Sequence, residues 1–255
     1  MTGILQGKSY IVTGAGGGIG REAALVIAEA GANVVVTDVA ADRGRDALGA
    51  IERAGRRGSF FKADLASESE IKALIQHAVK TFGRLDGAFN NAGLEQCALP
   101  LHELTLEQWE RAIRIDLTSV FLCIKYEVIA MLKSGGGSIV NTASSLGQVA
   151  IANASEYIAA KHGVVGLTRA AAAEYGKLGI RVNAVLPGIV LTPMISRLVE
   201  DAQFSAFFDK VKERHPIGRF GQPREIGEAV KWLLSDAASF VNGAAFAVDG
   251  GYLAV

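Results

Sequence analysis

Short apolar runs alternate with longer amphipathic stretches along almost the whole chain. The runs at 9–13 and 33–38 are rich in β-branched residues and have the length of buried strands. Further strands are expected at 59–63, up to 89, and at 138–142, 180–186 and 246–248, with helices at 21–30, 41–54, 67–82, 105–133, 156–177 and up to 234. Because strands and helices alternate, the pattern predicts an α/β fold: a doubly wound parallel sheet of about seven strands with helices on both faces.

Length and composition favour one domain. At 255 residues, with 50% hydrophobic and 20% charged residues, the chain can bury a large core and is not expected to be disordered. It shows no internal repeat, low-complexity tract or linker, so a single domain over residues 1–255 is predicted. Lysine plus arginine equal aspartate plus glutamate at 26 each, which argues against a nucleic-acid partner or an anionic membrane surface.

The N-terminus and the cysteines point to a cytoplasmic protein. The N-terminus lacks the apolar core of a secretory signal, and no apolar run is long enough to span a membrane. Cys97 and Cys123 are not spaced like metal ligands, so reduced thiols are expected and no metal site is predicted.

A glycine-rich turn follows the first predicted strand. Gly14, Gly18 and Gly20 precede the helix at 21–30, where glycine lets the backbone turn tightly and approach a phosphate. The second strand ends in Asp38, 18 residues past Gly20, which is near the spacing of the acid that binds adenosine ribose hydroxyls. A flexible turn is the alternative. Because the strand, the helix and the acid agree, we interpret the region as a Rossmann-like dinucleotide-binding unit.

A candidate acid–base pair lies later in the chain. Tyr157 and Lys161 are four residues apart in the predicted helix at 156–177, so they lie on one face, one turn from each other. A nearby ammonium favours the phenolate form of a tyrosine, and a phenolate is a usable base. Free tyrosine has a pKa near 10, so work near neutrality needs about 4 kcal/mol of stabilisation. One charge at about 4 Å can supply this at an effective dielectric near 20.

Three motifs occur together in the chain: Thr13-Gly14-x-x-x-Gly18-x-Gly20, Asn90-Asn91-Ala92-Gly93, and Ser144 thirteen residues before Tyr157-x-x-x-Lys161. With them the sequence resembles the short-chain dehydrogenase/reductase family from about Gly7 to Tyr252. The resemblance implies hydride transfer between a nicotinamide and a carbinol or carbonyl carbon.

The resemblance also implies catalytic roles for four residues. Tyr157 would act as base in oxidation and acid in reduction, Ser144 would hydrogen-bond the reacting oxygen, and Lys161 would also hold the nicotinamide ribose. Ser145 is the weaker choice, since the offset to Tyr157 matches the family at Ser144. The family usually has asparagine at Asp116, where it helps to hold a water linked to the lysine. Aspartate still accepts hydrogen bonds, but it cannot donate like an amide and it adds a negative charge.

The predicted cofactor is NAD rather than NADP. Asp38 would accept ribose hydroxyls and repel a 2′-phosphate, and neither Gly17 nor Val39 provides the basic side chain common in NADP-preferring relatives. Arg43 is nearby but is expected to face solvent. The resemblance implies cofactor contacts from Gly14, Gly18, Ile19, Gly20, Asp38, Asp64, Leu65, Asn91, Ala92, Gly93, Tyr157, Lys161, Pro187, Gly188, Ile189 and Thr192.

An apolar, uncharged substrate is expected, because the segments at 94–99 and 146–155, which should line its pocket, carry no lysine or arginine. The predicted substrate residues are Leu94, Leu146, Gln148, Val149, Asn153 and Met194. The amphipathic segment at 192–215 predicts either a lid over the substrate or a helix that only covers the core. In the family, the helices at 105–133 and 156–177 form a subunit interface, so a homo-oligomer is implied, with a tetramer favoured.

Three functions follow from these features. The favoured one is an NAD-dependent oxidoreductase of a secondary alcohol or ketone, because segments such as 215–220 resemble the family branch that acts on cyclic alcohols and diols. The second is a 3-oxoacyl carrier-protein reductase, which would normally require NADPH and basic residues for an acidic carrier. The third is a non-catalytic nucleotide-binding protein, which would be expected to lack Tyr157 or Lys161.

Overall fold

Seven parallel strands form the centre of the protein. The computed structural model describes residues 3–200 and 205–255, and its strands lie in the order β3-β2-β1-β4-β5-β6-β7. They are β1 (Ser9–Thr13), β2 (Asn33–Asp38), β3 (Gly58–Lys62), β4 (Gly87–Asn90), β5 (Gly137–Thr142), β6 (Ile180–Pro187) and β7 (Ala245–Val248). The predicted doubly wound parallel sheet is confirmed. Its strand order reverses between β1 and β4, the place where such sheets bind ligands.

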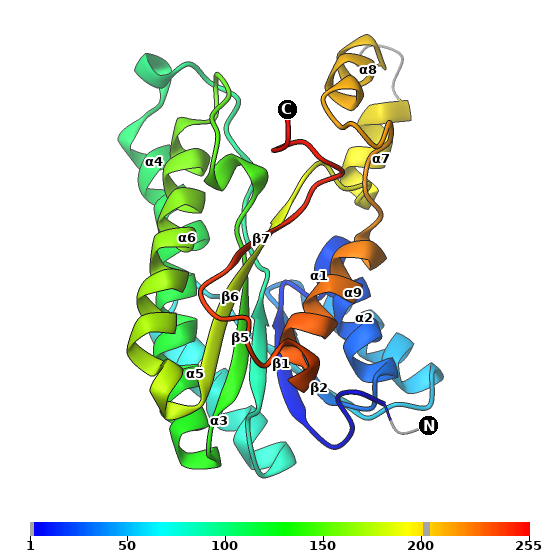
Figure 1. The fold of residues 1–255 in the computed structure, drawn as a ribbon, viewed down its shortest axis with the longest axis vertical. Helices are drawn as coiled ribbons and strands as arrows, with labels where there is room; N and C mark the ends of the chain where they lie inside the picture. Colours follow the sequence, from blue (N-terminus) through cyan, green and yellow to red (C-terminus); the bar gives the residue numbers. More distant parts are fainter. Residues whose placement is uncertain (1–2, 201–204) are drawn as a thin grey trace.

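Helices cover both faces of this sheet. The α-helices are α1 (Gly18–Glu29), α2 (Ala41–Arg53), α3 (Glu68–Phe82), α4 (Leu106–Ile113), α5 (Ser119–Ser134), α6 (Ser155–Tyr175), α7 (Pro193–Glu200), α8 (Ser205–Glu213) and α9 (Pro223–Leu234). Short 3₁₀ turns are η1 (Leu101–Glu103), η3 (Ser145–Gly147), η4 (Gly176–Leu178) and η5 (Asp236–Ala238). Figure 1 shows α3, α5 and α6 on one side and α1, α2 and α9 on the other, with α7 and α8 beyond one end. Within the described residues, none of these helices has the length and hydropathy of a membrane span.

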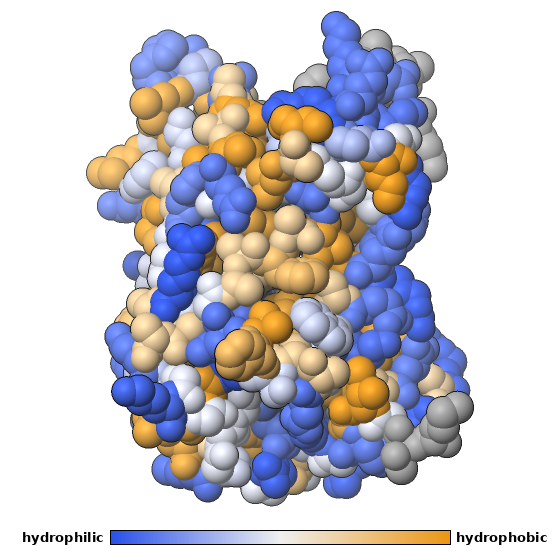
Figure 2. All heavy atoms as spheres, viewed as in Figure 1, coloured by the Kyte–Doolittle hydropathy of each residue, from blue (hydrophilic) through white to orange (hydrophobic). Residues whose placement is uncertain are grey.

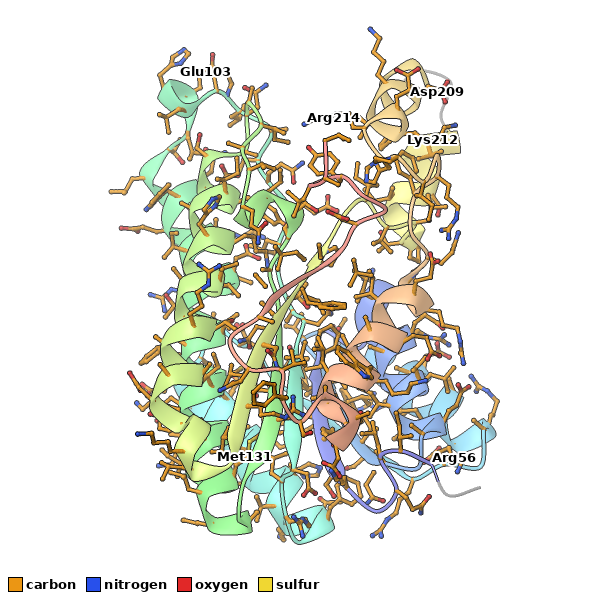
Figure 3. The ribbon with its side chains drawn as sticks, in the orientation of Figure 1. Arg56, Glu103, Met131, Asp209, Lys212 and Arg214 are labelled. Atoms are coloured by element: carbon orange, nitrogen blue, oxygen red, sulfur yellow. The ribbon has the colours of Figure 1, made fainter. Side chains whose placement is uncertain are left out.

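Alternate residues of β1 and β2 pack into two separate hydrophobic cores, one on each face of the sheet. Ile11 and Val35 pack in the core on the side of α3, α5 and α6, together with Met131 of α5, which Figure 3 labels. Val12 and Val36, one position further along, pack in the core on the side of α1 and α9. All five side chains are fully buried, and each contributes roughly 1.5–3 kcal/mol. A one-residue slip would exchange the two faces, so burial fixes the register of β1 and β2.

The helix predicted at 105–133 is interrupted, so that prediction is wrong in its middle. The residues Arg114–Thr118 (η2) form a π-helical turn between α4 and α5. Thr105 caps α4 as expected, in a capping box with Gln108. A π turn adds a residue to the helical repeat and is common at functional sites. Here the turn carries Asp116, which is 1% exposed. Hydrophobic spacing alone cannot reveal one added residue.

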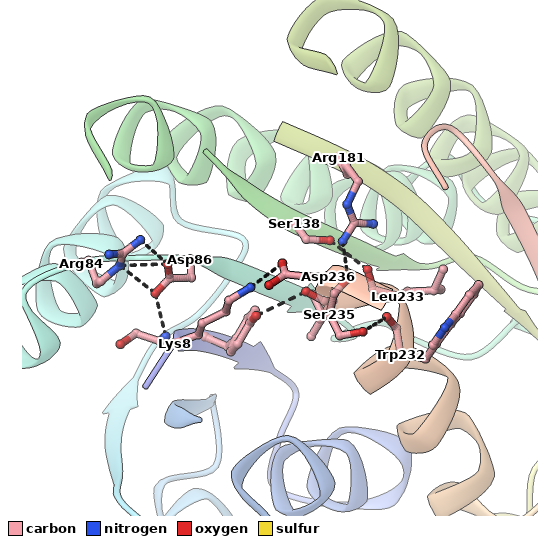
Figure 4. A network of polar contacts seen from close by, with 12 residues as sticks. Lys8, Arg84, Asp86, Ser138, Arg181, Trp232, Leu233, Ser235 and Asp236 are labelled. Carbon is pink, nitrogen blue, oxygen red and sulfur yellow. Dashed lines mark hydrogen bonds and ion pairs between the residues drawn. The ribbon is translucent and has the colours of Figure 1, made fainter. Parts of the chain in front are cut away.

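A polar network lies at the amino-terminal ends of the strands (Figure 4). Asp86 accepts a hydrogen bond from the Ser9 N–H at 2.9 Å and pairs with Arg84 at 2.6 Å. Arg181 of β6 donates to the Ser235 carbonyl at 3.0 Å, which ties β6 to the segment after α9. These contacts lie at the opposite ends of the strands from the glycine turn. We therefore assign them a structural role.

A second polar network lies inside the protein. Glu127 of α5 is fully buried, and its Oε2 accepts a hydrogen bond from Asn90 Nδ2 at 3.0 Å. The same amide donates to Asn141 at 3.0 Å, and Asn141 donates to Thr168 of α6 at 3.0 Å. Burial raises the pKa of Glu127 to about 8, although the hydrogen bond from Asn90 acts in the opposite direction. Two central strands are thus joined to α5 and α6 through a carboxyl that stays protonated near neutrality.

Replacement of this carboxyl, Glu127→Gln, should stabilise the protein at alkaline pH. The unfolded chain releases the Glu127 proton above about pH 4.5, whereas the folded state keeps it until about pH 8. The wild type should therefore lose stability, relative to the variant, as the pH rises through this window and should lose no more beyond it. Thermal unfolding followed by circular dichroism should show a gap in Tm of several degrees at pH 8 and little gap near pH 4.5.

An exposed acid on α4 provides the control. Glu110→Gln should leave the pH dependence of Tm unchanged, because Glu110 is exposed. A Tm gap for Glu127→Gln that does not grow with pH would contradict the assignment of a buried, protonated Glu127.

Candidate active site

The glycine turn is held in place by the segment that follows β4. The Thr13 hydroxyl accepts hydrogen bonds from the N–H groups of Asn91 and Ala92 at 2.9 and 3.0 Å. The Asn91 amide donates back to the Thr13 carbonyl at 3.2 Å. A Cβ on Gly14 would lie 2.9 Å from Ala92 Cα, and one on Gly20 would lie 2.2 Å from the Gly14 carbonyl oxygen. The turn needs glycine here because two backbones meet. Sequence reasoning placed Thr13 in the glycine motif but gave it no role; the structure shows that it organises this contact.

Asp38 ends β2 beside the turn. Its Oδ2 accepts a hydrogen bond from the Gly16 N–H and its Oδ1 from the Ala40 N–H, each at 2.9 Å. Two backbone donors orient the carboxylate, and its oxygens keep lone pairs for further donors. Arg43 is exposed, as expected. Its Cβ nevertheless lies only 2.8 Å from the position of a Cβ on Gly16.

Most of the other predicted cofactor residues lie at the carboxyl-terminal ends of the strands, as the glycine turn does. A Cβ on Gly18 would lie 3.0 Å from Thr192 Cγ2, so the glycine turn and the segment after β6 are in contact. The Asp64 side chain accepts a hydrogen bond from the Ala66 N–H at 2.9 Å. Leu65, in contrast, is 8% exposed and packs in the core. Ile19 belongs to α1, Pro187 ends β6, and Gly188 and Ile189 follow it.

Lys161 connects two of the other predicted catalytic residues, Tyr157 of the same helix and Asp116 of η2, to the end of β5. Its Nζ lies 5.3 Å from the centre of the Tyr157 ring and 3.5 Å from Asp116 Oδ1. It also donates a hydrogen bond to the Thr142 carbonyl, at the end of β5, at 3.2 Å. Lys161 is 3% exposed. A buried ammonium of this kind requires the compensation that Asp116 and the carbonyl give.

Asp116 is also buried and is hydrogen-bonded to the backbone. Its Oδ1 accepts a hydrogen bond from the Leu94 N–H at 2.9 Å, whereas its buried Oδ2 has no hydrogen-bond partner among the described residues. Burial raises the pKa of Asp116, while the Lys161 ammonium and the Leu94 N–H act in the opposite direction. A Cβ on Gly93 would lie 2.6 Å from Asp116 Oδ1 and 3.4 Å from Lys161 Nζ. Glycine at position 93 thus lets the backbone pass directly beside the ion pair.

The two neighbouring serines differ in their surroundings. Ser145 is 3% exposed, and its hydroxyl donates to the Pro187 carbonyl at 3.1 Å. Ser144 is partly exposed, and its hydroxyl accepts a hydrogen bond from the Leu146 N–H at 3.1 Å. That contact leaves the Ser144 hydrogen available for a substrate oxygen. The geometry therefore gives Ser145 a structural bond and supports Ser144 as the reactive hydroxyl.

The predicted substrate residues lie mainly on the segments after β4 and β5. Leu94 follows Gly93, Leu146 lies in η3, Gln148 follows η3, Val149 is 38% exposed, and Asn153 has a φ of 63° shortly before α6. Met194 belongs to α7, and its side chain is outside the part of the chain that the structure describes. In the segment at 192–215, residues 201–204 lie outside the described residues. Phe208 of α8 packs against Phe220, with ring centroids 6.1 Å apart.

Glu156 was not predicted as a site residue. It precedes Tyr157, is fully buried, and its Oε1 accepts a hydrogen bond from the Cys97 N–H at 2.6 Å. Ala98, the residue after Cys97, has a φ of 58°, which is uncommon outside glycine. Glu156 thus holds the segment that carries Leu94 in a strained conformation. Nothing in the sequence indicated that Glu156 is buried, because a glutamate in a helix is usually exposed.

Comparison with known proteins gives the same family over nearly the whole chain. The profile of the family described as enoyl-(acyl carrier protein) reductase matches residues 14–253. A 2,5-dichloro-2,5-cyclohexadiene-1,4-diol dehydrogenase of Sphingobium indicum is 48% identical over 253 residues, which cover 98% of this chain and 99% of that protein. A cyclohexanol dehydrogenase of Acinetobacter sp. is 45% identical over 252 residues, covering 99% and 97%. The chain belongs to the short-chain dehydrogenase/reductase family.

Solved structures of this family share the fold. The crystal structure of levodione reductase matches with a TM-score of 0.94 at 36% identity, covering 98% of this chain and 99% of that one. An actinorhodin polyketide ketoreductase with NADPH matches with a TM-score of 0.91 at 36% identity, covering 99% of each chain. This short-chain dehydrogenase/reductase is thus an oxidoreductase with a nicotinamide cofactor. Its choice between NAD and NADP has to be argued from its own residues.

Proposed function

We propose that this short-chain dehydrogenase/reductase is an NAD-dependent dehydrogenase of secondary alcohols, with apolar cyclic alcohols or diols as substrates. The observation that carries the proposal is the buried Lys161 ammonium, which lies beside the Tyr157 ring, Asp116 and Gly93. The two relatives at 48% and 45% identity are named for cyclic diol and cyclic alcohol substrates, which supports this class. Leu94 and Leu146 add apolar surface next to the reactive groups.

In the proposed mechanism, Tyr157 removes the hydroxyl proton of the alcohol as the carbinol carbon loses its hydride. A bound nicotinamide supplies the hydride acceptor. Lys161 stabilises the phenolate through its charge, and Ser144 donates its hydrogen to the substrate oxygen. In the reverse direction Tyr157 returns the proton to the carbonyl oxygen.

The cofactor preference rests on the end of β2. A Cβ on Gly17 would meet nothing within 4 Å, so the glycine turn has open backbone there that suits a pyrophosphate, and the oriented Asp38 carboxylate suits ribose hydroxyls. A 2′-phosphate would meet the Asp38 charge, and the nearby Arg43 is exposed, where screening weakens its attraction. Steady-state kinetics with one alcohol should give a kcat/KM for NAD at least about tenfold above that for NADP. A higher kcat/KM with NADP would refute the preference.

A substrate panel tests the proposed reaction. Formation of reduced cofactor should be measured with cyclic alcohols, cyclic diols and linear alcohols, and cofactor oxidation with 3-oxoacyl thioesters. We expect the highest kcat/KM with cyclic secondary alcohols or diols. A preference for 3-oxoacyl thioesters with NADPH would instead support a carrier-protein reductase. Tight cofactor binding without turnover on the panel would support a non-catalytic nucleotide-binding protein.

Asp116→Asn should shift the pH profile of alcohol oxidation. The Asp116 carboxylate, 3.5 Å from Lys161 Nζ, offsets part of the charge that stabilises the Tyr157 phenolate. Asparagine keeps the shape without the charge, so the phenolate should form more readily. We expect the pH of half-maximal kcat/KM to fall by about one unit. Asp46→Asn, which removes an exposed carboxylate on α2, should leave the profile in place. An unchanged or upward-shifted profile for Asp116→Asn would contradict this role.

The surface supports the proposal of a homo-oligomer, with a tetramer favoured. Phe121, Ile129 and Leu132 follow one face of α5 and are 46–47% exposed. Figure 2 shows apolar side chains over β7 and the adjoining tail, where Phe246 is 37% exposed, and Phe240 before β7 is fully exposed. Apolar faces of this kind commonly mark subunit contacts. Light scattering of the purified protein measures the state, and a monomer at micromolar concentration would contradict the proposal.

We also propose that 192–215 serves as the substrate lid of the single catalytic domain at 1–255. The contact of Phe208 with Phe220 supports an anchored base for this segment. A lid of this kind would exclude water from the Tyr157 hydroxyl during hydride transfer.

A further inference from the structure

His215 lies where three segments of the chain meet behind the end of β6. It follows α8 and is 2% exposed. Its ring centroid is 5.6 Å from that of Phe220 and 5.2 Å from that of Tyr252 in the C-terminal tail. Its Nε2 accepts a hydrogen bond from the Ile189 N–H at 3.2 Å, and its Nδ1 lies 3.0 Å from the Val211 carbonyl oxygen. Both ring nitrogens therefore have backbone partners.

These partners assign the tautomer of the ring. The Ile189 N–H can only donate, so Nε2 must be the nitrogen without a hydrogen. The Val211 carbonyl can only accept, so Nδ1 must carry the hydrogen. His215 is therefore the neutral Nδ1–H form, with an acceptor directed at the segment after β6 and a donor directed at α8.

The acceptor fixes the peptide between Gly188 and Ile189. In a planar trans peptide the N–H and the C=O point in opposite directions. By holding the Ile189 N–H, His215 thus directs the Gly188 carbonyl to the side away from the imidazole. The contact is close, since a Cβ on Gly188 would lie 2.9 Å from Nε2. A cavity of about 320 Å³ borders Ile189, His215 and Ile217, so packing alone does not hold this side of the peptide.

The ring also connects that peptide to the tail and to α8. The Ile217 N–H donates to the Gly250 carbonyl at 3.1 Å. The Arg214 guanidinium lies 4.7 Å from the centre of the Tyr252 ring, and Figure 3 shows Arg214 beside the tail. A displacement of α8 or of the tail would therefore act on the peptide through His215.

We propose that His215 is a positioning residue for the nicotinamide half of the cofactor, acting through the Gly188–Ile189 peptide. This inference rests on the proposed function: Ser145, next to Ser144, donates to the Pro187 carbonyl, so the segment of Gly188 and Ile189 lies beside the reactive groups, where the family resemblance implies that it contacts the nicotinamide. It makes a selective prediction. Loss of the Nε2 acceptor should weaken the binding of NAD, whereas ADP-ribose, which has no nicotinamide, should bind as before.

Two substitutions separate the two nitrogens of the ring. The glutamine amide reaches as far from Cα as Nε2, so His215→Gln can still accept from the Ile189 N–H. The asparagine amide reaches only as far as Nδ1, so His215→Asn keeps a donor for Val211 and loses the acceptor. Calorimetric titration of the full chain with NAD and with ADP-ribose should show a Kd for NAD raised about tenfold in His215→Asn. The Kd for ADP-ribose should stay within about twofold, and His215→Gln and the exposed control His102→Asn should resemble the wild type in both.

The outcomes are distinct. Equal loss of both ligands in His215→Asn, no loss at all, or a His215→Gln as weak as His215→Asn would overturn the inference while leaving the proposed function intact. If the wild type bound neither NAD nor ADP-ribose, the proposed function itself would be contradicted. If His215→Asn does not fold, Gly188→Ala replaces it, because its Cβ would lie 2.9 Å from both Nε2 and the Asp249 carbonyl oxygen and would force the peptide and the ring apart. The same selective loss of NAD is expected there, and a normal Kd for NAD would overturn the inference.

Discussion

Tyr157→Phe should lower kcat for alcohol oxidation by on the order of 10³-fold or more. The substitution removes the group that takes the proton while keeping the ring next to Lys161, whose Nζ lies 5.3 Å from the ring centre. No other described side chain in this arrangement can replace it, because Lys161 is held by Asp116 and the Thr142 carbonyl. The Kd of the cofactor, measured by titration, should change by no more than about threefold, the size of one lost hydrogen bond.

Tyr126→Phe is the matched control. It also removes one phenol hydroxyl, but that hydroxyl donates to the exposed Glu68 of α3 at 2.7 Å and not to a predicted catalytic residue. Its kcat should stay near that of the wild type. If Tyr157→Phe retained most of the turnover on a confirmed substrate, the assignment of the base would be wrong.

Lys161→Met should reduce both turnover and stability. Turnover should fall by on the order of 10²-fold or more, because the phenolate loses its nearest positive charge. Stability should fall because Asp116, 1% exposed, would remain buried without its counter-ion. A buried charge without its partner typically costs about 3–5 kcal/mol, which lowers Tm by roughly ten degrees in a chain of this size.

The double variant Lys161→Met/Asp116→Asn distinguishes the two effects. Asparagine removes the uncompensated charge, so Tm should recover most of its loss, whereas turnover should stay low because the ammonium is still missing. Thermal unfolding and kcat of the single and double variants complete the cycle. Recovery of turnover in the double variant would show that Lys161 acts mainly by neutralising Asp116 and not on Tyr157.

The sequence alone determined the architecture of this protein. Strand and helix runs alternate in the chain, and buried parallel strands have few other ways to pack, so the doubly wound sheet followed directly. The glycine turn and Asp38 could be recognised because their meaning depends on local spacing. The Tyr157–Lys161 pair could be proposed for the same reason, since residues four apart on a helix share one face.

The tertiary structure decided the contacts between segments that are distant in the chain. Spacing could not show that Gly93 passes within contact of the Asp116–Lys161 pair, since these residues come from three different elements. The π turn that carries Asp116 depends on one added residue, and Leu65 lies in the core although its neighbours reach the surface. His215 shows the limit most clearly. Its tautomer and its hold on Ile189 follow from the direction of two backbone groups, and such directions exist only once the chain is folded.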